Sequence, residues 1–176
     1  MPLADYLWHP ILVHFSVALL SLATVFYLLS ALFPNAVLVS QWRTVAEWNL
    51  WVGTGLTLLT ILFGWLAFNT VSHDDAAHEP MKLHALLGLV TASGFGLLTL
   101  WSFAERKIGK HPSAGFAAMI AICFGFLVVT GLRGGELVYH YGLAISSPTP
   151  AKEVVREPAN AHTNHAHSHD AKGHSH

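Results

Sequence analysis

Four long segments of the chain are free of charged residues. The stretches 11–33, 49–68, 83–103 and 114–132 contain no Lys, Arg, Asp or Glu, and they are 23, 20, 21 and 19 residues long. A helix needs about 20 apolar residues to cross the hydrocarbon core of a bilayer, which is about 30 Å thick. The pattern therefore predicts four transmembrane helices and an all-α fold, an integral membrane four-helix bundle in the lipid bilayer.

Small and aromatic residues along these segments fit this interpretation. Small residues recur at a spacing of four, as in Ala92 with Gly96 and Ala121 with Gly125, and such pairs allow helix backbones to approach closely in lipid. Tryptophans lie near the segment ends, where their rings favour the headgroup region. They are Trp48, Trp51, Trp65 and Trp101.

The composition changes at Ser146. From there the chain consists of Ser, Pro, Thr, Ala, Lys, Glu and then His, with almost no large apolar residue. Such a segment cannot bury a core of its own. The sequence therefore predicts a transmembrane domain over residues 1–145 and a disordered, histidine-rich tail over residues 146–176.

Four crossings divide the polar segments between two faces of the membrane. The N-terminus, the loop 69–82 and the C-terminal segment share one face, here called side A, and the other two loops share the opposite face, side B. Side B has the larger share of basic residues close to the helices, namely Arg43, Arg106, Lys107 and Lys110. The positive-inside rule then favours side B as cytoplasmic. In a bacterial inner membrane, both termini would be periplasmic.

Overall composition narrows the functional classes. The chain is 53% hydrophobic and 11% charged, with a formal net charge of -1, so it has no excess basic surface for a nucleic acid. The single cysteine, Cys123, excludes an internal disulfide, a covalent haem attachment motif and a cysteine-built metal site. Metal chemistry would have to use histidine and carboxylate side chains.

The histidines supply the strongest indication of function. His9, His14, His73, His78, His84 and His140 map to side A. His14 lies about a turn inside the first segment and His84 begins the third, where unpaired polar groups are costly. Ala18 follows His14 by four residues, and Gly88 and Ala92 follow His84 by four and eight. Such clearance suits a flat macrocycle between helices, although ordinary helix packing uses the same small residues.

These positions predict non-covalent haem b as a cofactor. His14 and His84 would be the axial ligands, and His9 and His140 would be outer-shell or alternative ligands. Lys82 and Arg133 near the same surface would pair with the haem propionates.

Two further groups of side chains suggest a transition-metal site. His73, Asp74 and His78 lie at spacings that one helical turn would bring together. Six imidazoles in the tail would bind divalent transition ions, although a solvated tail without a role has the same composition. They are His162, His165, His167, His169, His174 and His176.

The glycines of GLRGGELVYHYG predict an interruption of the fourth helix. Gly131, Gly134 and Gly135 would break it and turn Glu136 and His140 back over the mouth of the bundle.

Three motifs resemble one bacterial family. HPILVHF (9–15), MKLHALLG (81–88) and GLRGGELVYHYG (131–142) are similar to segments of the four-helix membrane proteins called domain-of-unknown-function family 2231. The resemblance covers residues 5–145 and implies four helices with short loops. It also marks the histidines at 9, 14, 84 and 140 and the glycines at 134 and 135. Some members of this family look as if they are joined to cytochrome c-type domains, and the resemblance therefore implies a redox partner such as a cytochrome.

Three functional hypotheses remain open at this stage. The first is a haem b protein for one-electron transfer in the membrane. The second is a transition-metal handling or permeation protein that uses the side-A histidines and the tail. The third is a structural subunit of a membrane assembly, which needs no ligand. The sequence gives no catalytic residue and no oligomeric state.

Overall fold

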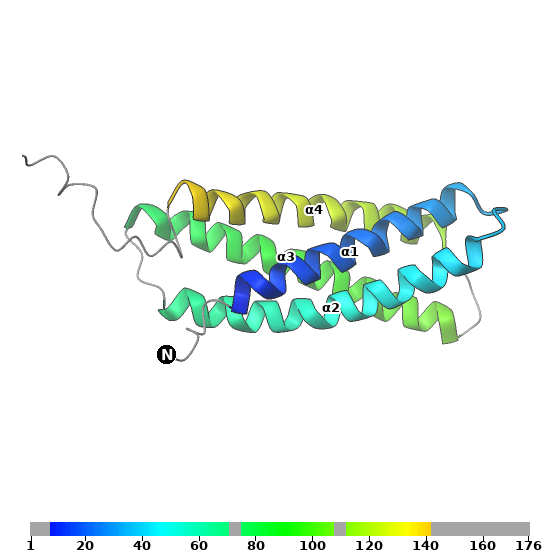
Figure 1. Cartoon of the computed structure of the whole chain (residues 1–176), viewed down its shortest axis with the longest axis horizontal. Helices are drawn as coiled ribbons and strands as arrows, with labels where there is room; N and C mark the ends of the chain where they lie inside the picture. The colour runs from blue at the N-terminus through cyan, green and yellow to red at the C-terminus, as the bar shows by residue number, and fades with distance from the viewer. Residues whose placement is uncertain (1–7, 71–74, 108–111, 142–176) are drawn as a thin grey trace, which may run out of the picture. The chain divides into compact units, whose positions relative to one another are not determined.

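Four helices make up almost all of the residues that the computed structural model describes, which are 8–70, 75–107 and 112–141. The helices are α1 (Trp8–Leu32), α2 (Val39–Thr70), α3 (Asp75–Lys107) and α4 (Ala114–Tyr139) (Figure 1). All four are long and apolar enough to cross a membrane. The prediction of an all-α membrane bundle is confirmed.

All four helices are longer than the charge-free segments that predicted them, and α2 and α3 exceed them by the largest margin. Helix α2 already begins at Val39, and α3 begins at Asp75. Charged residues end the apolar run but not the helix, because Glu, Lys and Arg have high helix propensity once the chain leaves the hydrocarbon core. The expected loop over 69–82 is therefore largely helical. Only residues 71–74 separate α2 from α3, and they lie outside the described residues.

The predicted break in α4 is wrong. The helix continues through Gly131, Gly134 and Gly135 and ends at Tyr139, with His140 as its C-cap. Glycine weakens a helix interior by about 1 kcal/mol but does not prevent the helix, and glycines are common in transmembrane helices. Helix packing gives one of them a different role, because the imidazole of His84 lies against Gly134.

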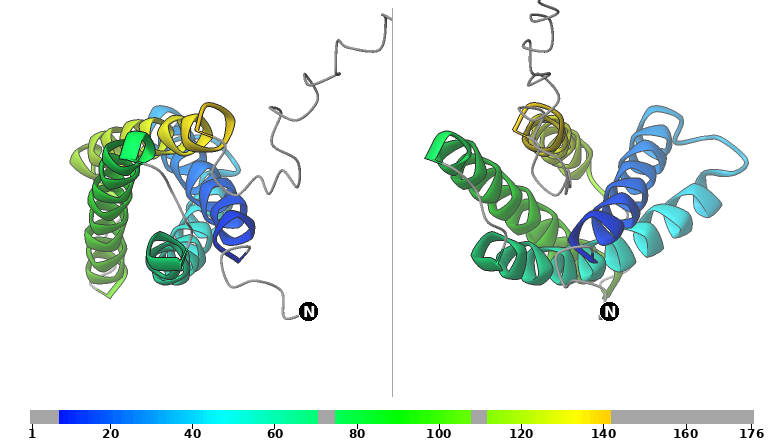
Figure 2. Two further views of the ribbon diagram at one scale, coloured as in Figure 1. Left: turned by 90° about the vertical axis from the view of Figure 1, so that its left-hand side faces the viewer. Right: turned by 60° about the vertical axis from the view of Figure 1, so that its left-hand side comes forward.

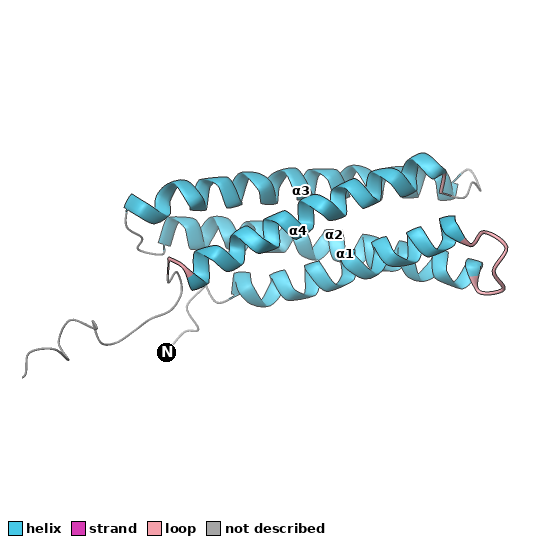
Figure 3. Ribbon diagram, turned by 90° about the horizontal axis from the view of Figure 1, so that it is seen from above, coloured by secondary structure: helices cyan, strands magenta, loops and turns pink. Residues whose placement is uncertain are grey.

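The helices are arranged in a ring in chain order. Helix α1 packs most extensively against α2, and α3 against α4, while α2 with α3 and α1 with α4 complete the ring. Figure 2 (left) shows the four helix ends in this order, and Figure 3 shows the helices running alongside one another. The start of α1, the end of α2, the start of α3 and the end of α4 lie at one end, which is side A (Figure 1).

The tightly packed core occupies the side-B half of the bundle. Its members are Leu20, Ala23, Tyr27, Ala46, Leu50, Phe95, Leu98, Phe116, Ile120, Cys123 and Leu127. Hydroxyl pairs mark the limit of this core: Ser16 with Thr60, and Thr91 with Thr130. Among the described side chains beyond that layer, toward side A, only Met81 and Leu137 are buried. More of the described side chains are therefore buried in the side-B half than in the side-A half.

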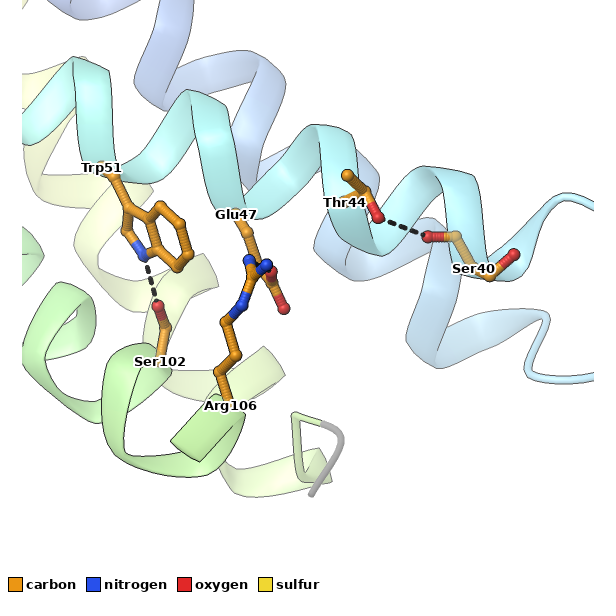
Figure 4. A network of polar contacts seen from close by, with 6 residues as sticks. All are labelled: Ser40, Thr44, Glu47, Trp51, Ser102 and Arg106. Carbon is orange, nitrogen blue, oxygen red and sulfur yellow. Dashed lines mark hydrogen bonds and ion pairs between the residues drawn. The ribbon is translucent and has the colours of Figure 1, made fainter. Parts of the chain in front are cut away.

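A polar network joins α2 to α3 near side B (Figure 4). The indole N–H of Trp51 donates to Ser102 Oγ at 2.7 Å, and an Arg106 nitrogen lies 2.7 Å from Glu47 Oε2. The Arg106 guanidinium also lies over the Trp51 ring, 5.0 Å from its centroid. The Trp51 ring stacks on Phe103 with 4.4 Å between centroids. These contacts hold the two helix pairs together at this end.

Candidate binding site at the side-A end

His9 is fixed against α2 by a hydrogen bond and a close packing contact. Its Nδ1 lies 2.9 Å from the backbone carbonyl oxygen of Thr60. A carbonyl can only accept, so Nδ1 carries the proton, and Nε2 of the neutral imidazole keeps a free lone pair. The ring lies against Gly64, where an added Cβ would be 2.9 Å from ring atoms Cε1 and Nδ1. Glycine at 64 is therefore what lets the imidazole approach the helix.

His84 packs against a glycine of α4, as His9 does against α2, but without the corresponding hydrogen bond. Its ring lies against Gly134, where an added Cβ would be 3.0 Å from Cε1. Its Nδ1 is buried and has no hydrogen-bond partner among the described residues. One turn along α3, Gly88 faces the Thr130 methyl group, and Thr91 shares a hydrogen bond with the Thr130 hydroxyl at 3.0 Å.

The two imidazoles belong to helices that lie diagonally across the ring. His9 is on α1 and His84 is on α3, and these two helices make no direct contact with each other. Both side chains are partly buried at the end where few of the described side chains are buried. The arrangement can present two neutral imidazole nitrogens from opposite walls of the bundle.

His14 and His140 have different surroundings. The Nδ1 of His14 donates to the Pro10 carbonyl of its own helix at 2.6 Å, and the side chain is exposed. His14 is about 200° around α1 from buried Ser16, because successive helical residues turn by about 100°. His140 is exposed at the end of α4, with its ring in edge contact with Tyr141 at 4.9 Å. Neither contacts the other predicted ligands in the described residues.

The two predicted propionate partners form ion pairs on their own helices. Lys82 Nζ lies 2.9 Å from Glu79, and an Arg133 nitrogen lies 2.8 Å from Glu136. All four side chains are largely exposed, so these pairs contribute little to stability. Both basic groups are at side A, where an anionic group would compete with the glutamates for them.

The predicted transition-metal ligands are mostly outside the described residues. The ligands that lie outside the described residues are His73, Asp74 and the six tail histidines. His78 lies in α3, with its ring 6.2 Å from that of Phe68. Within residues 8–70, 75–107 and 112–141, no group of three or more His, Cys, Asp or Glu side chains is placed to hold a metal ion.

Sequence reasoning missed the residues that hold the imidazoles. Thr60, Gly64 and Thr130 were not singled out, and Gly134 was assigned to a helix break. The signal that would have found them is a shared spacing: a Thr precedes a Gly by four residues in both α2 and α4. That spacing puts a hydroxyl and a cleared helix surface on one face, one turn apart.

The fold and this site define the chain as a multi-pass integral membrane protein with polar side chains gathered at one end of a four-helix bundle. It belongs to the family described as Predicted membrane protein (DUF2231), which matches residues 8–147. The resemblance seen in the three sequence motifs is thereby confirmed. No curated protein and no solved structure matches the chain.

Proposed function

We propose that the protein binds one haem b between α1 and α3 at side A and serves one-electron transfer in the membrane. His9 and His84 would be the axial ligands, rather than the pair His14 and His84 that the spacing alone favoured. In a bacterial inner membrane with both termini periplasmic, this site would face a periplasmic redox partner such as a cytochrome.

The observation that carries the proposal is the hydrogen bond from His9 Nδ1 to the Thr60 carbonyl. Metal-bound histidines commonly donate their second ring N–H to a backbone carbonyl or a carboxylate, which fixes the tautomer and the ring orientation. This bond leaves Nε2 of His9 available to a metal. His14 makes a similar bond only to its own helix and is exposed, which favours His9 as the ligand.

The interior near the two histidines supports a bulky apolar occupant. Protein interiors are normally close-packed, yet few described side chains are buried on the side-A side of the hydroxyl layer. Gly64 and Gly134 have no side chain, which allows the His9 ring to lie close to α2 and the His84 ring to lie close to α4. A haem macrocycle would be held between the two rings, while Lys82 and Arg133 lie at the end where propionates would emerge.

Haem would supply a one-electron couple that the polypeptide lacks. The protein's own contribution would be to hold two neutral imidazoles, to limit the access of water and to tune the potential through the hydrogen bond behind His9. No residue is assigned to bond-making chemistry.

Absorption spectroscopy of the purified full-length protein tests the proposal. We expect a Soret band that shifts on reduction with dithionite, at one haem per chain. Colourless protein from haem-supplemented cells would contradict the proposal. Colourless protein with stoichiometric zinc, copper or nickel would favour the metal-handling hypothesis instead.

Substitutions distinguish the proposed ligands from the exposed histidine. His9→Ala and His84→Ala should each reduce bound haem at least about tenfold, whereas His14→Ala serves as the matched control on the same helix and should keep it. Loss of haem in His14→Ala with retention in His9→Ala would reverse the ligand assignment.

A further inference from the structure

The two helix pairs repeat the same contacts at matching positions. Residues 75 positions apart in α1 and α3, and 70 positions apart in α2 and α4, correspond to each other. The His9 ring lies against Gly64 and the His84 ring against Gly134, although within the described residues only His9 Nδ1 makes a hydrogen bond, to the Thr60 carbonyl.

The hydroxyl layer follows the same correspondence. Ser16 and Thr60 lie 3.0 Å apart in the first pair, and their equivalents, Thr91 and Thr130, lie 3.0 Å apart in the second. Both bonds lie seven residues, or about 10 Å of helix, from the histidines. Each imidazole therefore lies at the same distance along its helix from the hydroxyl pair of its own hairpin.

The buried positions of the helices correspond as well. Each residue of the following pairs is buried: Leu20 and Phe95, Ala23 and Leu98, Thr24 and Thr99, Tyr27 and Ser102, Ala46 and Phe116, and Leu50 and Ile120. The same offsets thus align contacts and much of the burial pattern over several turns of every helix, although some equivalents, such as buried Thr54 and partly buried Phe124, differ.

In both helix pairs, the closest approach between the two helices is at equivalent positions. The glycine at that approach is on α2 in the first pair and on α3 in the second. A Cβ added to Gly53 of α2 would lie 3.1 Å from Leu19 Cβ of α1. The equivalents are Cys123 of α4 and Gly94 of α3, and there a Cβ added to Gly94 would lie 2.8 Å from Cys123 Sγ. Each pair thus has one glycine at this crossing, on opposite helices.

From these observations we infer that the chain is two copies of one helix hairpin, related by an approximate two-fold axis along the bundle, and that its binding site lies on that axis. The ring order of contacts fits, since a half-turn exchanges α1 with α3 and α2 with α4. The occupant must then present the same chemistry to both imidazoles. This inference rests on the proposed function for the identity of the ligand, a metal in a flat macrocycle with two open trans positions.

The ion pairs depart from the repeat at both ends of the bundle. At side A, Lys82–Glu79 and Arg133–Glu136 have no equivalents, because the corresponding positions are Leu7, Ala4, Phe63 and Leu66. At side B, the Glu47–Arg106 ion pair occurs once, because the equivalent positions are Ala117 and Ala31.

Cysteine cross-linking tests the repeat without reference to any ligand. In a Cys123→Ala background, oxidation should cross-link S16C/T60C and T91C/T130C to similar extents. The equivalent control pairs S16C/L58C and T91C/V128C place the second cysteine at exposed positions on α2 and α4, and they should stay uncrosslinked. Cross-linking of one hydroxyl pair but not the other would overturn the repeat.

Four glycine variants test whether the site lies on the axis, with the Soret absorbance per protein as the readout. Gly64→Ala and Gly134→Ala should each lower it at least about fivefold and by similar factors, because each added Cβ displaces one imidazole. Gly55→Ala and Gly125→Ala, equivalent positions with nothing within 4 Å, should leave it unchanged.

The outcomes of the two experiments are distinguishable. Equal cross-linking with no pigment in any protein would support the repeat and overturn the proposed haem function. Pigmented protein that is sensitive at only one of the two tight glycines would support haem binding and overturn a site on the axis.

Discussion

Gly94 is at the closest approach between α3 and α4, and its replacement by alanine tests the helix packing directly. The added Cβ would lie 2.8 Å from Cys123 Sγ, whereas nonbonded atoms of this kind prefer about 3.5–4.0 Å. Because Cys123 is buried, either its side chain or the helix must move by about 1 Å. Overpacking of this kind costs about 1–3 kcal/mol of unfolding free energy.

Gly96→Ala is the matched control on the same helix. An added Cβ there meets nothing within 4 Å. Both variants gain about 1 kcal/mol of helix propensity, so this contribution cancels when they are compared. We therefore expect Gly94→Ala to be less stable than Gly96→Ala by about 1–3 kcal/mol.

A double-mutant cycle combines Gly94→Ala with Cys123→Ala, which removes the sulfur that the added Cβ would contact. Cys123→Ala alone should cost about 1 kcal/mol through a small cavity, and Gly94→Ala with Cys123→Ala should recover most of the lost stability. The assay is reversible unfolding of the detergent-solubilised protein by sodium dodecyl sulfate. Equal stability of Gly94→Ala and Gly96→Ala, or no rescue by Cys123→Ala, would show that α3 and α4 do not meet at these residues.

Three further predictions concern the side-B network, the tail and the topology. Trp51→Phe removes the hydrogen bond to Ser102 and the indole beneath Arg106, so it should lower the unfolding free energy by about 1–2 kcal/mol in the same assay. An unchanged unfolding free energy would show that these two contacts do not stabilise the bundle. Deletion of residues 161–176 should abolish retention on immobilised nickel and leave thermal stability unchanged, whereas a lost bundle would mean that the tail docks. For the full chain, retention should weaken below about pH 6, because imidazole titrates near 6.5 and its protonated form cannot bind a metal. In a Cys123→Ala background, cysteines at Pro2 and Ser146 should react with an impermeant maleimide from the same membrane face, and labelling from opposite faces would rule out four crossings.

The sequence alone was sufficient for the number, type and approximate position of the helices. Exclusion of charge from 20-residue segments reflects the cost of burying charge in hydrocarbon, and that cost depends on composition rather than on neighbours. The same reasoning gave the polar end of the bundle, because an even number of crossings puts His9, His84 and His140 on one side. It underestimated the lengths of the helices, those of α2 and α3 the most, since helices continue past the charges that end an apolar run.

The tertiary structure decided which side chains share a site. His9 and His14 are five residues apart on α1, and only helix packing directs the first toward Thr60 and Gly64 and leaves the second exposed. It also decided the role of Gly134, which gives room to the His84 ring rather than breaking the helix. Periodicity fixes the angle of a side chain around its own helix, but contacts between helices depend on crossing and relative height. Those are set by close packing of residues distant in the sequence.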